Sequence, residues 1–133
     1  MAHELESYWL YIHPPLAFVG YVFIFLFTFL LLTERKKLGG RFRIEFFGAA
    51  AWSFTFLGLL TGMLWAQTAW GSYWTWDPKE TMTLLLFLAV SASLVAYYEK
   101  RPKAAKVLAV ASCALAILTL STSWIIEGLH SFA

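Results

Sequence analysis

The chain has 133 residues, of which 60% are hydrophobic, 19% are aromatic and only 14% are charged, and its formal net charge is +2. Soluble domains carry about 25% charged residues, so this chain has too few polar side chains to cover an apolar core in water. The composition excludes a disordered chain and an ordinary nucleic-acid-binding protein, and the single cysteine, Cys113, excludes an internal disulfide framework.

Four apolar stretches follow one another along the chain, at about residues 14–32, 46–66, 81–98 and 107–126. A membrane span needs roughly 17–25 mostly apolar residues, and runs of this length without alternation predict helices. In the first stretch the basic residues follow the apolar run and no small-residue cleavage site is present, so we interpret it as a span and not as a signal peptide. The sequence predicts an all-α integral membrane protein with a single four-helix domain over residues 1–133.

The basic residues indicate how these spans are oriented. Nine of the ten lie in the linker between the first two spans or in the linker between the last two: Arg35, Lys36, Lys37, Arg41, Arg43, Lys100, Arg101, Lys103 and Lys106. The positive-inside rule places both linkers in the cytoplasm. We therefore predict a multi-pass protein of the cytoplasmic membrane with both termini outside. Binding to anionic lipid or to a partner is the alternative role of these polybasic segments.

The remaining polar chemistry gathers on the predicted outer face. His13 stands at the outer end of the first span, and His130 stands four residues after the fourth. Two prolines follow His13, and this pattern predicts a histidine placed just before a helix start. Between the histidines lies a predicted outer loop, residues 65–81, in which four of the seven residues 70–76 are aromatic: Trp70, Tyr73, Trp74 and Trp76.

Two histidines and an aromatic platform are the groups that a haem site needs. Haem stacks against apolar surface, and imidazole nitrogens hold its iron. Gly71 would let the backbone approach closely between the first two aromatic residues. The alternatives are an ordinary interfacial belt of Trp and Tyr, and interfacial histidines that are only hydrogen-bonded surface residues.

Charged residues at the end of this loop have a structural interpretation of their own. Asp77, Pro78 and Glu80 form the pattern of a capping box, with Asp77 as N-cap and Glu80 at the third helical position. Lys79 is a candidate partner for a haem propionate, and otherwise it faces water. The chain contains no C-x-x-C-H motif, so it does not itself attach haem covalently.

The loop and its flanks resemble a known superfamily. The segment Trp70-Gly-Ser-Tyr-Trp-Thr-Trp-Asp-Pro-Lys-Glu-Thr81 is similar to the tryptophan-rich WWD signature of the haem-handling proteins of cytochrome c biogenesis, which include the CcmC, CcmF and CcsA types. His13-Pro-Pro-Leu-Ala-Phe-Val-Gly-Tyr21 resembles the segment with the first external histidine. Glu127-Gly-Leu-His-Ser-Phe-Ala133 resembles the segment with the second. Family members usually have six or more spans, so the chain resembles a minimal four-helix version.

The resemblance implies a function and a site. His13 and His130 would be the axial ligands of a non-covalent haem b held at the outer membrane face, and Trp70, Gly71, Trp74, Trp76 and Asp77 fall on signature positions. The chain would deliver haem for attachment to the C-x-x-C-H motif of apocytochrome c, as part of a haem export or haem lyase system and not as a stand-alone enzyme. Its partners would be other maturation subunits in the membrane or further copies of itself.

Two alternatives to this function stay open at the level of sequence. The first is a b-type haem subunit that keeps its haem for electron transfer or anchoring within a larger complex. Such carriers tend to hold histidines inside their spans, where this chain has none. The second is a structural subunit without haem.

Overall fold

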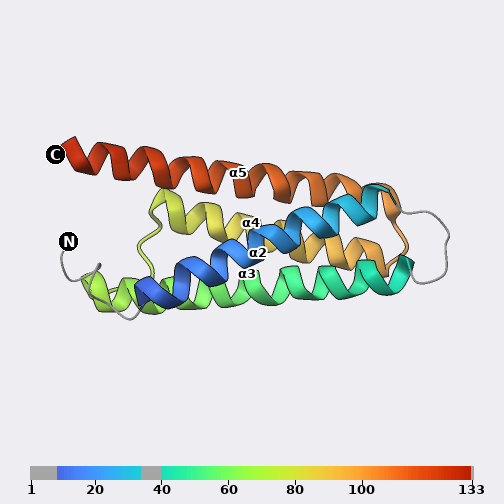
Figure 1. Ribbon diagram of the computed structural model, residues 1–133, viewed down its shortest axis with the longest axis horizontal. Helices are drawn as coiled ribbons and strands as arrows, with labels where there is room; N and C mark the ends of the chain where they lie inside the picture. The colour runs from blue at the N-terminus through green and yellow to red at the C-terminus, as the bar shows by residue number, and fades with distance from the viewer. Residues whose placement is uncertain (1–8, 34–39, 133) are drawn as a thin grey trace.

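Four long helices run up and down the molecule in alternating directions (Figure 1). The computed structural model describes residues 9–33 and 40–132, with the side chains of 15–33, 41–68 and 71–121. The helices are α2 (Trp9–Leu32), α3 (Gly40–Trp70), α4 (Pro78–Tyr98) and α5 (Pro102–Phe132). Each is long and apolar enough to cross a membrane. The predicted class, an all-α membrane protein with four spans, is confirmed.

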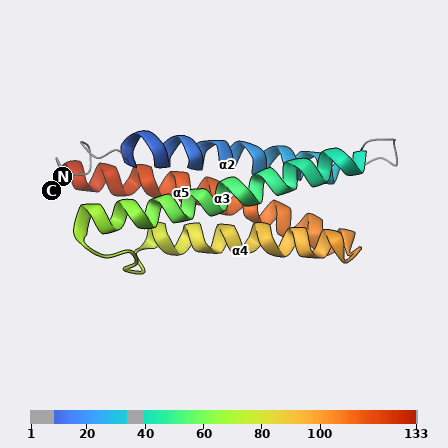
Figure 2. The same ribbon diagram turned by 90° about the horizontal axis from the view of Figure 1, so that it is seen from below.

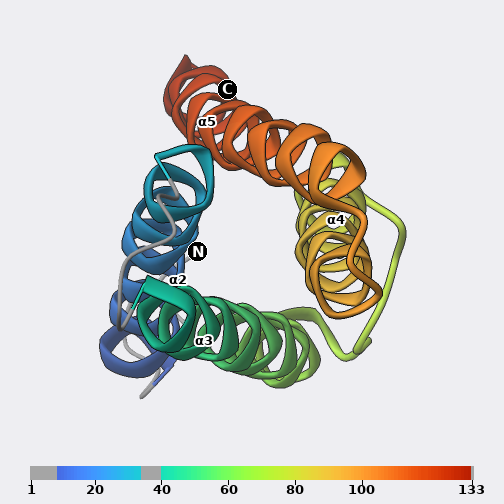
Figure 3. The ribbon, with the colours of Figure 1, turned by 90° about the vertical axis from the view of Figure 1, so that its right-hand side faces the viewer.

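The helices form a ring in chain order when the bundle is viewed along its axis (Figure 3). The α2 helix packs against α3 and α5, and α4 packs against the same two neighbours. At one end, which we call the loop end, lie the α3–α4 connection, the first turns of α2 and the last turns of α5 (Figures 1 and 2). At the other, the basic end, lie the α4–α5 turn, the end of α2 and the start of α3. The bundle thus separates the tryptophan-rich connection from the basic segments, as predicted.

The connection at the loop end is shorter than the sequence suggested. We predicted a loop over residues 65–81, but α3 continues to Trp70 and α4 begins at Pro78, so only residues 71–77 are outside helices. The reason is that residues 65–70 contain no proline or glycine, and a helix satisfies their backbone groups at no further cost. At the same end of the bundle, α5 likewise extends past the predicted limit of 126, to Phe132.

The start of α2 also differs from the prediction. The helix begins at Trp9, so His13 lies inside it and does not precede it. Pro14 and Pro15 lie near the start of the helix. Because proline has no backbone N–H, only the carbonyl groups in the turn before them lose their hydrogen-bond donors. The residues before His13, from Trp9 to Ile12, are all apolar, and near a membrane a helix is the conformation that pairs their backbone groups internally.

The core is built where all four helices meet. One cluster of buried side chains, toward the basic end, consists of Phe27, Leu31, Ile44, Ala96, Ala105 and Ala109. A second, nearer the middle, consists of Ile24, Ala51, Leu86, Val90 and Ala116. The small residues at these contacts let the helices approach closely, which is how helices associate in lipid. Large apolar side chains such as Phe18 and Phe29 point outward and are more than 60% exposed, as expected for a surface that faces lipid.

Hydroxyl groups add polar contacts between the helices inside this core. The Thr28 hydroxyl donates mainly to the carbonyl oxygen of Ile24 within α2 at 2.8 Å, and it also lies 3.3 Å from the carbonyl oxygen of Ala109 on α5. The Ser93 hydroxyl donates to the carbonyl oxygen of Ala105 at 2.8 Å and connects α4 with α5. Interhelical hydrogen bonds of this kind contribute about 0.6 kcal/mol each on average. They hold the helices in register and supplement the packing.

We predict that Gly48→Ala destabilises the bundle by about 1–3 kcal/mol. A Cβ atom at Gly48 would lie 2.7 Å from Leu94 Cδ2 and 2.9 Å from Cε1 of the buried Phe27 ring, so both side chains would have to move within the packed core. Gly58→Ala is the matched control, because its Cβ would lie at an ordinary 3.6 Å from Ala17 Cα. Unfolding of both variants in detergent measures the difference, and equal stability of the two would contradict the packing argument.

Candidate functional site

The loop end brings together the segments that the sequence singled out. His13 lies in the second turn of α2, and His130 lies near the end of α5. The α3–α4 connection lies at the same end of the bundle (Figures 1 and 2). The side chains of both histidines and of Trp70, the last residue of α3, are outside the described ones. Their predicted roles as ligands and as a stacking surface therefore stay predictions.

The two helices that carry the histidines diverge toward the loop end (Figure 1). Their described contacts, such as Thr28 with Ala109 and Cys113 with Thr28, lie nearer the basic end. The α2 helix instead stays beside α3 as far as Ala17, which lies next to Gly58. The histidine-bearing turns thus share one end of the bundle but belong to separate helix ends.

Gly71 ends α3 for a conformational reason. Its φ angle is +76°, a left-handed conformation that glycine adopts readily, and its N–H donates to the carbonyl oxygen of Gln67 at 2.9 Å. A Cβ atom on Gly71 would meet no atom of the described residues within 4 Å. The glycine is thus required here by the backbone conformation, and the expected close approach of the backbone within a haem site stays a prediction.

Asp77 and Glu80 hold the other end of the connection, as the capping pattern predicted. Asp77 has an extended backbone and its Oδ1 accepts the N–H of Glu80 at 2.7 Å, with Pro78 at the first position of α4. Glu80 reaches back along the chain, but further than in an ordinary capping box. Its Oε2 accepts the N–H of Thr75 at 2.7 Å, two residues before the N-cap. The Thr75 hydroxyl also donates to Glu80 Oε2 at 3.3 Å, and no pattern in the sequence indicated that these two residues meet.

The aromatic residues of the connection form a small exposed platform. The rings of Trp74 and Trp76 pack edge to face, with centroids 5.3 Å apart and an interplanar angle of 89°. Trp76 is 67% exposed and Tyr73 is 51% exposed, so both present ring surface outward. The indole Nε1 of Trp74 is buried and has no acceptor among the described residues. The connection thus presents apolar ring faces and, beneath them, an indole N–H with no acceptor among the described residues.

Trp76 has a strained backbone. Its φ angle is +58°, in the left-handed region where a residue with a Cβ atom costs about 1–2 kcal/mol. Such strain in a large residue persists only when the surrounding contacts impose it, and it often marks a functional position. Here the contacts are the Asp77 cap on one side and the Trp74 ring on the other. The intrinsic backbone preferences of tryptophan do not explain why an exposed tryptophan adopts this left-handed conformation.

The charges of the site divide into two groups. Asp77 and Glu80 use their carboxylate oxygens to accept backbone N–H groups, so they shape the connection. Lys79 lies in the first turn of α4 and is exposed, so its ammonium group is available to an anion. The described residues of the connection thus combine exposed ring surface with one exposed positive charge.

Comparison with known proteins identifies relatives of the chain. Residues 1–130 match the model of the family described as cytochrome c assembly protein. A cytochrome c biogenesis protein CcsA from Chlamydomonas reinhardtii is 32% identical over 96% of the chain and 41% of its own length. The CcsA protein of Gloeobacter violaceus is 38% identical over 57% of the chain and 23% of its own length. The chain thus spans less than half the length of these relatives, and no solved structure matches it significantly.

We predict that Asp77→Ala lowers the free energy of unfolding by about 1 kcal/mol, because the N–H of Glu80 loses its acceptor. Asp77→Asn should retain most of the stability, since asparagine caps helices about as well as aspartate. Hydrogen exchange of the amides of residues 75–81 in detergent measures both effects. Equal loss of protection in the two variants would show that the carboxylate charge, and not the cap, holds the connection.

Proposed function

Because the chain belongs to the cytochrome c assembly protein family, we propose that it binds haem at the loop end of the bundle and takes part in its delivery for cytochrome c maturation. In this proposal His13 and His130 are the axial ligands of a non-covalent haem b. The tryptophan-rich connection covers the ring. Haem is the cargo that the site receives and releases.

One observation carries the proposal: the start of α2, the end of α5 and the 71–77 connection lie at the same end of the bundle (Figures 1 and 2). Two imidazole ligands of one haem must lie on opposite faces of the porphyrin, so the helix ends that carry them must lie apart. The divergence of α2 and α5 toward this end is compatible with that requirement. The haem iron would bind two imidazole nitrogens, and the protein would position these imidazoles and surround the ring with apolar side chains.

The described residues of the connection fit such a ligand. Tyr73 and Trp76 present exposed rings that can stack on the macrocycle. The buried N–H of Trp74 lacks an acceptor among the described residues, and a propionate oxygen would provide one. Lys79 would add a positive charge for the same acidic edge of the ligand.

Release of the cargo requires a site that is held in shape but open. The Asp77 cap and the contact between Glu80 and Thr75 maintain the connection without help from the ligand. The rings that they position are more than half exposed, so a partner protein can reach them. We infer that one imidazole is displaced while stacking on the connection still retains the ring.

The cellular setting is also part of the proposal. We place the chain in the cytoplasmic membrane with the loop end and both termini outside, because the basic segments lie at the opposite end of the bundle. Its partners are other maturation subunits or a second copy of the chain, and the final acceptor is an apocytochrome c. The chain would act as one component of a haem lyase system.

The histidine ligands are tested by absorption spectroscopy of the protein purified in detergent from haem-replete cells. His13→Ala and His130→Ala should each lower haem affinity at least about tenfold, because even groups that only support a metal ligand contribute that much. The chain has one further histidine, His3, which lies outside the motifs of the family resemblance, so His3→Ala is the matched control and should leave the haem b spectrum unchanged. Haem that moves to an apocytochrome c supports delivery. A spectrum that neither ligand variant alters would refute the site, and haem that stays bound while it cycles between oxidation states would indicate an electron carrier instead.

Trp74→Phe should separate haem binding from folding. Phenylalanine keeps an aromatic ring against Trp76 but removes the buried N–H. Affinity for haem should fall roughly tenfold or more, since a hydrogen bond to a charged group contributes about 1.5–3 kcal/mol. The haem-free protein should be no less stable, because a desolvated donor is removed. Titration with haem and unfolding without it measure the two quantities, and a parallel loss of both would show that Trp74 acts only in packing.

A further inference from the structure

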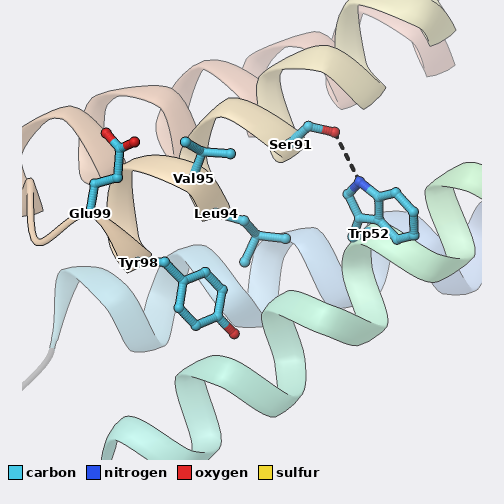
Figure 4. Close-up of a pocket in the computed structure, with 6 residues that line it drawn as sticks. All are labelled: Trp52, Ser91, Leu94, Val95, Tyr98 and Glu99. Atoms are coloured by element: carbon cyan, nitrogen blue, oxygen red, sulfur yellow. Dashed lines mark hydrogen bonds between the residues drawn. The ribbon is translucent and has the colours of Figure 1, made fainter.

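A groove of about 380 Å³ lies on the outer surface of the bundle between α3 and α4 (Figure 4). It is far from the connection and occupies the half of the bundle toward the basic end. Its lining is Trp52 from α3 and Ser91, Leu94, Val95, Tyr98 and Glu99 from the α4 side. The groove lies on a surface of exposed apolar side chains such as Val95, as expected of one that faces lipid.

The end of the groove nearer the middle of the bundle is bounded by Trp52 and Ser91, and the lining between the two ends is apolar. The indole N–H of Trp52 donates to the Ser91 hydroxyl at 2.9 Å, which joins the two helices there (Figure 4). Phe87 packs against the Trp52 ring at 5.5 Å and reinforces this junction. From Ser91 to Glu99 the groove follows α4 for about 12 Å, at a rise of about 1.5 Å per residue. Leu94 and Val95 line the stretch between the two ends.

The outer end of the groove is polar. Tyr98 turns its hydroxyl group toward α3 (Figure 4), the helix whose start carries Arg41. Glu99 is paired with Arg101 at 3.8 Å, and Arg41 is paired with Glu45 at 2.9 Å. The two arginine side chains are 77% and 73% exposed, so these pairs are weak and the guanidinium groups can bind another anion.

The surroundings of this outer end are strongly basic. Among the described residues, six basic side chains belong to the basic end: Arg41, Arg43, Lys100, Arg101, Lys103 and Lys106. Only two acidic ones, Glu45 and Glu99, accompany them, and both are in the ion pairs above. An apolar channel that opens beside a basic surface matches a molecule with an apolar tail and an anionic head. Basic pockets between membrane helices bind anionic lipid headgroups in this way.

We propose that the α3–α4 groove is a binding site for a phospholipid with an anionic headgroup. One acyl chain lies along Leu94 and Val95 as far as the Trp52–Ser91 junction, and the phosphate is held by Arg41 and Arg101. The apolar lining and the basic surface at its outer end together match an acyl chain joined to an anionic headgroup.

The test is lipid retention by the full chain, purified in detergent after exposure to vesicles of phosphatidylcholine and phosphatidylglycerol in equal amounts and measured by native mass spectrometry. The unmodified chain should retain phosphatidylglycerol in preference to phosphatidylcholine. Val95→Trp fills the groove and should abolish this retention. Val110→Trp on α5 is the matched control, because Val110 is 48% exposed and Val95 is 56% exposed, so both substitutions face lipid.

The headgroup contacts are tested separately. Arg41→Gln and Arg101→Gln should each lower the preference for phosphatidylglycerol about fivefold, the equivalent of about 1 kcal/mol per basic residue near an anionic membrane surface. Arg41→Lys keeps the charge and should keep most of the preference. Equal retention of the two lipids by the unmodified chain would overturn the proposal. So would retention that survives Val95→Trp, or a dimer of the unmodified chain that this substitution dissociates, since a second copy would then occupy the groove.

Discussion

Lipid offers no hydrogen-bond partners to the backbone, and this constraint governs the whole molecule. Every apolar stretch must pair its own N–H and C=O groups, so each forms a helix that continues until a residue stops it. In α3 that residue is Gly71, which reverses the sign of φ just after Trp70. In α4 the start is set by Asp77, whose carboxylate accepts a free backbone N–H. The tryptophan-rich connection, residues 71–77, is the segment between the end of α3 and the start of α4.

The shortness of this connection matters for the site. With only residues 71–77 outside helices, its backbone is held at both ends and crossed by the contact between Glu80 and Thr75. The aromatic rings are therefore positioned by the ends of two membrane helices and not by a long mobile loop. This tight segment also contains the strained backbone of Trp76 and the buried N–H of Trp74, which has no acceptor in the described part of the chain.

The two ends of the bundle differ in their side chains and in how closely the helices pack. Toward the basic end, small and hydroxyl-bearing residues such as Ala105, Ala109 and Ser93 bring the helices close together. Toward the loop end α2 and α5 diverge (Figure 1). The helices thus pack closely toward the basic segments, whereas the ends of α2 and α5 at the loop end lie apart (Figure 1).

The sequence alone determined the number of spans, the separation of basic and aromatic segments and the cap at Asp77, because each depends on residues that are close together in the chain. It also indicated the histidines and aromatic residues of the site through their resemblance to a family. Only the tertiary structure decided that α3 continues to Trp70, that His13 lies inside a helix and that Glu80 contacts Thr75. The buried N–H of Trp74 and the groove beside Trp52 also appear only there, since they depend on which surfaces meet when separate segments pack.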